Sequence, residues 1–213
     1  MARQLHSVIG GRYLAGLWGN DLLDELCWQV DQLTLTPRLR IYRSPSWSWA
    51  AVDSTIYRSA SFAQPGKGQD HLEVLECVSV LASPDPYGAV LAAHLRLRGK
   101  FIIGILKISE QTGSRLLVLI RILEQEDTFF PDYQLERLGR RYKLHDTTVY
   151  CLPVRSDPEW VYLLVLRPVL NVENTFERIG SVTLLCSGFS DLPSFENGVW
   201  APGTNSLQEF TLV

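Results

Sequence analysis

From residue 47 onward the chain is divided into short apolar or alternating segments by Pro, Gly, Asp and Ser, and this pattern constrains the fold more than any other feature. Alternation is clearest at 94–98, where leucines face one side and His94, Arg96 and Arg98 the other. Many strands with few helices between them predict a mainly β protein, built as a single antiparallel β-barrel or a barrel-like sandwich. The predicted strands are 47–53, 55–61, 71–82, 93–98, 101–108, 115–123, 147–155, 160–168 and 178–187.

The remaining segments complete a single-domain organisation of all 213 residues. Apolar residues at helical spacing over 13–32 predict a helical flank spanning 1–32. The strands then occupy 42–187, followed by a C-terminal tail at 188–213. Residues 124–146 separate two predicted strands by an unusually long stretch, which predicts a long loop with a short helix and a lid role.

Composition and motifs exclude several classes of function. The 20 Lys and Arg against 23 Asp and Glu give a net charge of −3, so we expect no nucleic-acid partner. No apolar run reaches the roughly 18 residues of a membrane helix, and Arg12 interrupts the weakly apolar N-terminus, so we expect a cytoplasmic protein without a membrane partner. The cysteines lack zinc-ligand spacing, and no nucleotide-binding glycine loop occurs. We therefore expect no metal and no cofactor.

Several motifs, taken in order, resemble one known protein family. YLAGLW at 13–18 precedes YRSPSWSWAAVD at 42–53, and DPYGAV at 85–90 precedes LRLRG at 95–99. This order resembles the region C-terminal to the HET domain in fungal heterokaryon-incompatibility proteins, over roughly residues 12–180. The HET domain itself is not in this sequence, so the resemblance implies either a fragment or a stand-alone tail. Because the incompatibility role belongs to the HET domain, the resemblance implies little chemistry for this chain.

The Trp-rich motif supplies the first candidate site residues. If 47–53 is a strand, Trp47 and Trp49 lie on one face of it. The two indoles then either line an apolar ligand cavity or plug the core of the barrel. Arg43 and Asp53 flank this motif. They form a bidentate ion pair that closes the strand ends, or Arg43 donates hydrogen bonds to a substrate carbonyl.

Two further groups complete the candidates. The face shared by His94, Arg96 and Arg98 needs partners or a ligand if it points inward, and is ordinary solvated surface if it points outward. The aromatic residues of 124–146 belong either to the lid or to a solvated insert with a basic face. The catalytic candidates are Arg43, His94 and Arg98. The substrate-binding candidates are Trp47, Trp49, Arg96, Phe129, Phe130 and Tyr133.

These residues support two hypotheses of different kinds. The first is a cofactor-independent enzyme of fungal secondary metabolism that binds a small apolar or aromatic ligand, of polyene or quinone-methide type. It would promote a cyclisation or a (hetero-)Diels–Alder cycloaddition by orientation and hydrogen bonding. The alternative is a non-catalytic interaction module, the β tail of a heterokaryon-incompatibility-type protein, which predicts an exposed apolar patch. Both allow a homodimer. An open cavity lined by Trp47 or Trp49 favours the enzyme, and a filled interior favours the module.

Overall fold

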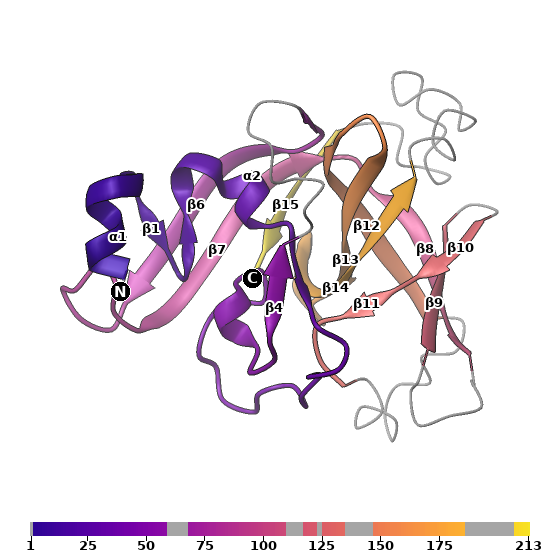
Figure 1. Cartoon of the computed structure of the whole chain (residues 1–213), viewed down its shortest axis with the longest axis horizontal. Helices are drawn as coiled ribbons and strands as arrows, with labels where there is room; N and C mark the ends of the chain where they lie inside the picture. The colour runs from indigo at the N-terminus through magenta and orange to yellow at the C-terminus, as the bar shows by residue number, and fades with distance from the viewer. Residues whose placement is uncertain (1, 59–67, 110–116, 123–124, 135–146, 186–206) are drawn as a thin grey trace.

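The chain folds around one large β-sheet, which confirms the mainly β prediction (Figure 1). The structure is a computed structural model that describes residues 2–58, 68–109, 117–122, 125–134, 147–185 and 207–213. Its 11-stranded sheet contains β5 Gln69–Asp70, β6 Glu73–Leu81, β7 Val90–Gly99, β8 Ile102–Ser109, β9 Leu117–Ile122, β10 Gln125–Thr128, β11 Phe130–Pro131, β12 Thr147–Ser156, β13 Trp160–Pro168, β14 Thr175–Leu185 and β15 Gln208–Leu212.

The sheet is barrel-like in one part without closing as a whole. Its main path runs β10–β9–β8–β12–β13–β14–β15–β7–β6, and neighbours are antiparallel except β14 and β15. The path has two ends, so the complete sheet is not a closed barrel. However, β10 pairs with β9 while β11, which follows it directly, pairs with β14. The sheet therefore curls round between these strands, as a barrel-like sandwich requires.

Two apolar cores lie on opposite faces of the central strands. Side chains alternate along these strands, so that Leu164 joins the first core and its neighbours Leu163 and Val165 the second. The first core also takes residues from the N-terminal region, including Trp47, and the second is completed by β8 and β9. The middle parts of β12 to β14 are consequently buried on both faces, which explains the nearly continuous apolar sequence of β13.

The prediction of a helix over 13–32 is wrong. A helix α1 lies earlier, at Ala2–Ile9, and the 13–32 segment forms a hairpin, short helical turns and a strand. Ala15 and Gly16 have positive φ angles of 50° and 107°, which a helix does not allow and a tight hairpin turn uses. The elements are β1 Tyr13–Leu14, β2 Leu17–Trp18, the 3₁₀ turn η1 Gly19–Asp21, α2 Leu22–Glu25 and β3 Trp28–Val30, which pairs with β4 Ile56–Arg58.

Three other sequence-based boundaries need correction. Residues 47–53 are not a strand but a turn followed by the 3₁₀ turn η2 Trp49–Ala51, which the Ser48 hydroxyl caps by accepting from the Ala50 N–H at 3.0 Å. The predicted tail contains β15, a strand inside the sheet between β14 and β7. The described part of 124–146 forms β10 and β11, and the short helix predicted there lies outside the described residues.

Candidate functional site

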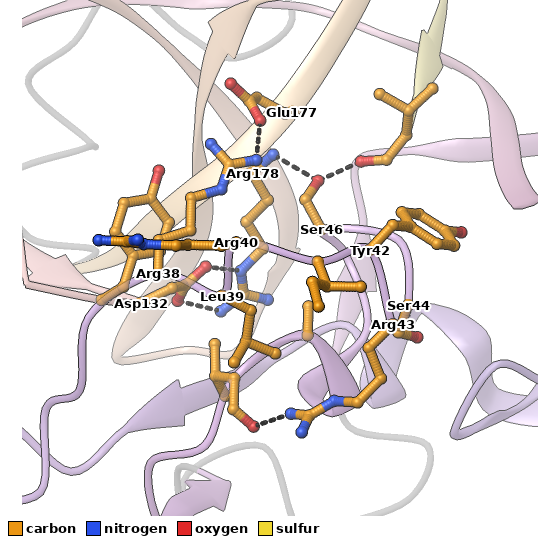
Figure 2. Close-up of a pocket in the computed structure, with 15 residues that line it drawn as sticks. Arg38, Leu39, Arg40, Tyr42, Arg43, Ser44, Ser46, Asp132, Glu177 and Arg178 are labelled. Carbon is orange, nitrogen blue, oxygen red and sulfur yellow. Dashed lines mark hydrogen bonds and ion pairs between the residues drawn. The ribbon is translucent and has the colours of Figure 1, made fainter. Parts of the chain in front are cut away.

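A pocket of about 410 Å³ opens where the segment 38–46 crosses the ends of β11 and β14 (Figure 2). Its volume falls in the range of roughly 300–1,000 Å³ that is typical of small-molecule sites. Arginine, tyrosine and serine side chains meet apolar ones around it. The lining residues are Arg38, Leu39, Arg40, Ile41, Tyr42, Arg43, Ser44, Ser46, Ala51, Val52, Asp132, Tyr133, Glu177, Arg178 and Val213.

Arg43 holds in place the 43–53 loop, which forms part of the pocket wall. Its Nη1 contacts the Asp53 carboxylate at 2.6 Å, so the predicted ion pair is present, but through one guanidinium nitrogen rather than the two of a bidentate pair. Its Nε donates to the carbonyl oxygen of Ala50 at 2.6 Å, and its Nη2 to that of Val52 at 2.8 Å. Three guanidinium nitrogens therefore hold the 43–53 loop closed, so the position of Arg43 at the pocket is explained by a structural role.

Ser46 ties the same loop to the sheet. Its backbone N–H and its hydroxyl both donate to the main-chain oxygen of Val213, just beyond β15. The backbone N–H of Arg178, on β14, donates to the Ser46 hydroxyl at 2.9 Å. The pocket wall is thus attached to two neighbouring strands that pair in parallel.

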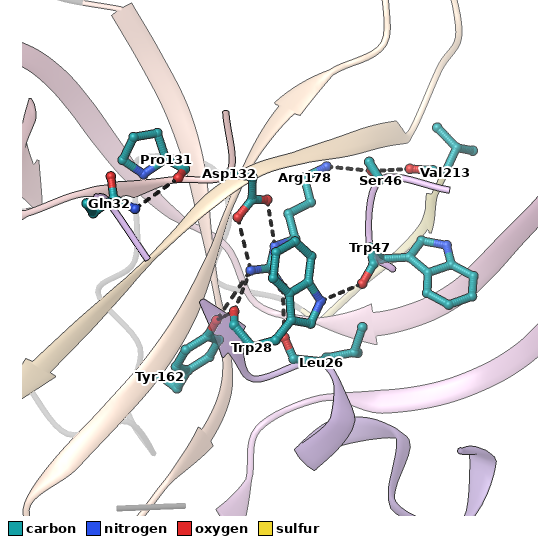
Figure 3. Close-up of polar contacts among 10 residues, drawn as sticks. All are labelled: Leu26, Trp28, Gln32, Ser46, Trp47, Pro131, Asp132, Tyr162, Arg178 and Val213. Carbon is teal, nitrogen blue, oxygen red and sulfur yellow. Dashed lines mark hydrogen bonds and ion pairs between the residues drawn. The ribbon is translucent and has the colours of Figure 1, made fainter. Parts of the chain in front are cut away.

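A buried arginine belongs to the pocket lining, and Figure 3 shows its polar contacts. Arg178 is 1% exposed and makes a bidentate contact with the Asp132 carboxylate, at 2.9 and 3.2 Å. Its other donors reach the carbonyl oxygens of Leu26 at 2.8 Å and Trp28 at 2.6 Å. Burial by itself acts to lower the pKa of Arg178, but the neighbouring Asp132 carboxylate has the larger and opposite effect. The net pKa of Arg178 is raised, so the guanidinium keeps its charge.

A second carboxylate, Glu177, lies between two arginines at the pocket edge. Arg38 and Arg167 each donate to one of its oxygens. Burial raises the pKa of Glu177, but the hydrogen bonds and charges of the two arginines outweigh burial and hold the pKa below its usual value. Because the charged form is favoured in the fold, this carboxylate links stability to pH.

Glu177→Gln is expected to flatten the acid side of the stability profile. The ordinary pKa of this carboxyl is 4.5, and the folded-state value lies below it, so the folded chain binds fewer protons than the unfolded one. The stabilisation is complete above about pH 4.5 and is lost as the pH falls through the folded-state pKa. Urea unfolding from about pH 3 to pH 7 measures this slope. Glu76→Gln, at an exposed ion pair of β6, is the control, and equal acid slopes in wild type and Glu177→Gln would contradict the account.

Two polar groups at the pocket have no partner within the described part of the chain. Arg40 is exposed and makes no hydrogen bond or ion pair with any described residue. The hydroxyl of Tyr133 also lacks a hydrogen-bond partner there, but its oxygen is fully covered and does not reach the open space of the pocket. Burial raises the pKa of Tyr133 to about 12, so its hydroxyl stays a proton donor at neutral pH. The guanidinium of Arg38 lies 5.3 Å from the centre of the Tyr133 ring.

The two tryptophans of the motif do not share one face. Trp47 is 0% exposed and packs in the first core, whereas Trp49 is 39% exposed and donates from Nε1 to the carbonyl oxygen of Gly16 at 2.9 Å. They separate because they lie in a turn and a 3₁₀ turn rather than in a strand. Trp47 therefore fills the interior and lines none of the described pockets, as the structural alternative for this residue predicts.

The remaining candidates lie away from the pocket, with one exception. The face of His94, Arg96 and Arg98 points outward: Arg98 contacts Glu73 at 2.8 Å and Glu209 at 2.7 Å across neighbouring strands. It is a solvated surface with cross-strand ion pairs. In the 124–146 segment, Phe129 is buried in the second core and Phe130 is half-buried on β11. Of the nine candidates, only Arg43 and Tyr133 line the pocket.

Sequence reasoning missed most of the arginines at this site. In the sequence, Arg38 and Arg40 alternate with Leu39 and Ile41. This local cluster of arginines is a signal from which a binding wall could have been predicted. In contrast, Asp132 and Arg178 are 46 positions apart, and nothing local in the sequence indicates that they pair.

Comparison of the chain with protein-family models, with curated proteins and with solved structures found no match. Across the described ranges, no set of three His, Cys, Asp or Glu side chains is placed to hold a metal ion. No helix in those ranges has the length and apolar character needed to cross a membrane.

Proposed function

We propose that this chain is a small-molecule-binding module whose ligand occupies the pocket beneath the 38–46 segment. The observation that carries the proposal is the pocket itself, whose volume of about 410 Å³ suits a small molecule and whose lining combines the apolar Leu39 and Ile41 with arginine side chains. Covering the apolar side chains with a ligand contributes roughly 25 cal/mol per Å² of surface removed from water.

The catalytic version of this proposal is that the pocket binds a substrate and promotes its reaction without a cofactor. The sequence hypothesis placed an apolar polyene or quinone-methide-type substrate against Trp47 and Trp49, but Trp47 is part of a filled core. At the pocket, Leu39 and Ile41 offer an apolar wall, while Arg40 offers a donor. A hydrogen bond from such a donor to an oxygen that gains negative charge would favour cyclisation or cycloaddition.

A second candidate function, the non-catalytic interaction module, is favoured by the filled interior at Trp47 and by helix α1. Leu5, Val8 and Ile9 are 43%, 83% and 41% exposed and lie at helical spacing on one face. On another face His6 stacks on the Trp18 ring, with centroids 6.0 Å apart. An exposed apolar helix face favours docking of a partner protein. The resemblance to the tail of heterokaryon-incompatibility proteins implies a HET domain as that partner.

Binding of a small aromatic probe tests the main proposal. We expect N-phenyl-1-naphthylamine, which is neutral, or 8-anilinonaphthalene-1-sulfonate, which is anionic, to gain fluorescence when titrated with the protein. Ala51→Phe places a ring in the pocket and should weaken the bound signal at least about tenfold, by steric exclusion. The matched control is Ala89→Phe, at an exposed turn residue away from the pocket.

The same titration separates the two candidate functions. The triple variant Leu5→Ser, Val8→Ser, Ile9→Ser removes the apolar face of α1 and should leave probe binding unchanged. If this variant abolishes binding while Ala51→Phe does not, the probe sits on the helix and the interaction-module function is favoured. Circular dichroism of each variant checks that the fold is retained.

A further inference from the structure

We infer that residues 37–42 form a movable strap at the pocket, and that the ion pair between Arg38 and Glu177 is the latch that holds this strap closed. The inference rests on the proposed function, because it concerns how a ligand enters and leaves the same pocket. Residues 38–42 of the strap belong to the pocket lining, and Figure 2 shows Arg38, Arg40 and Tyr42 there.

Both ends of the strap are fixed by hydrogen bonds. Before it, the backbone N–H of Thr36 donates to the Ser54 hydroxyl at 3.0 Å, and the carbonyl oxygen of Thr36 accepts from the backbone N–H of Gln134 at 2.9 Å. After it, Arg43 is held by its contacts with the 50–53 loop. The strap is therefore a short span between two anchored points.

Between these points the strap has few contacts that would hold it down. Its backbone N–H and carbonyl groups make no hydrogen bond with any residue in the described part of the chain. Arg40 is exposed and Ile41 is 84% exposed, so these two side chains bury little surface. Segments with few buried apolar contacts and no main-chain hydrogen bonds open at a low cost in free energy.

Two side chains tie the strap to the large sheet. The Tyr42 hydroxyl is hydrogen-bonded by the backbone of Ala93, on β7. Arg38 donates to the Glu177 carboxylate, on β14, and its guanidinium lies 5.3 Å from the centre of the Tyr133 ring. Hydrogen bonds between charged groups are stronger than neutral ones, so the contact of Arg38 with Glu177 is the main tie.

Glu177 can release Arg38 and receive it again. Arg167 donates to the other oxygen of Glu177, so the carboxylate keeps its position when Arg38 leaves. The side chains of Arg38 and Glu177 are 38% and 16% exposed, which leaves the ion pair accessible to water. Partly exposed ion pairs contribute little to stability and are therefore broken easily. These properties suit a latch better than a permanent tie.

The kinetics of probe binding test the latch. We use N-phenyl-1-naphthylamine, because a neutral probe makes no ion pair with Arg38. Arg38→Met should raise the association and the dissociation rate constants together by about two- to fivefold, as expected for a partly exposed ion pair, and should change the affinity much less. Arg38→Lys, which keeps the charge, should restore most of the wild-type rates. Arg96→Met, at an exposed arginine of β7 outside the pocket, is the control and should change neither rate.

The mobility of the strap can also be measured without a probe. Backbone order parameters from ¹⁵N relaxation should be close to the rigid value of about 0.85 over 38–42 in the wild type. In Arg38→Met they should fall toward about 0.6, the upper limit for flexible backbone. The order parameters over 94–98 should be the same in both proteins.

Every other result decides against the latch or against the function beneath it. If Arg38→Met raises only the dissociation rate constant, Arg38 is a contact for the probe, so the inference fails while the proposed function stands. Equal order parameters over 38–42 in the wild type and Arg38→Met would also overturn the inference. If Ala51→Phe leaves probe binding unchanged, the proposed function fails, and the order parameters alone then decide whether Arg38 holds the strap.

Discussion

Replacing Arg178 with methionine is expected to lower the free energy of unfolding by about 3–5 kcal/mol, because it leaves a buried carboxylate without its partner. Asp132 is 2% exposed, and its two oxygens both accept from Arg178. The same substitution also removes the donors to the carbonyl oxygens of Leu26 and Trp28. Urea denaturation followed by circular dichroism measures the loss.

Two further variants make this first prediction specific. Arg96→Met removes an exposed arginine 3.8 Å from Glu76 and should cost no more than about 0.5 kcal/mol. The double variant Arg178→Met, Asp132→Leu should recover part of the loss, because no unpaired carboxylate remains. It should not recover all of it, since the carbonyl oxygen of Leu26 loses the donor that Arg178 supplied, while that of Trp28 keeps the hydrogen bond from the Tyr162 hydroxyl. A single Arg178→Met variant as stable as wild type would contradict the account of Arg178 and Asp132 as a buried pair in which the carboxylate depends on the arginine.

Trp47→Ala is expected to cost about 3–5 kcal/mol, because it removes a large, fully buried side chain from the first core. Trp49→Ala should cost about 1 kcal/mol, corresponding to one hydrogen bond and a half-exposed ring. Thermal and urea unfolding of the two variants give the comparison. The prediction follows from their separate positions, since two indoles on one strand face would give similar effects.

Trp47→Phe is the informative control for this second prediction. The indole N–H of Trp47 is buried and has no partner among the described residues, so phenylalanine loses no hydrogen bond there. We expect Trp47→Phe to be clearly more stable than Trp47→Ala. Similar losses for Trp47→Ala and Trp49→Ala would contradict the placement of Trp47 in the core.

The strands of the sheet were largely predictable, because their side chains alternate and turn residues separate them. β7 shows this best: Leu95 and Leu97 are fully buried, while Arg96 between them is exposed. The structure of residues 13–32 was not predictable in this way. Apolar residues at helical spacing there are buried by a hairpin and a strand instead, and only the turn at Gly16 gives a local sign of it.

The candidate site was predictable only where its contacts are local. Arg43 and Asp53 are ten positions apart and flank one motif, so their pairing could be proposed from the sequence. The contact of Ser46 with Val213 joins residues 167 positions apart, and it depends on how the sheet is ordered. Long-range pairing of this kind is set by the fold, so the pocket became visible only in the structure.

The central claim is that a small ligand binds beneath the 38–46 segment, and an NMR titration tests it most directly. Uniformly ¹⁵N-labelled protein is titrated with 8-anilinonaphthalene-1-sulfonate, and backbone amide shifts are followed residue by residue. The account predicts the largest shifts at 38–46, Tyr133 and Arg178, with little change along 94–98. Shifts concentrated on α1, or spread through the strands of the two cores without the 38–46 segment, would contradict it.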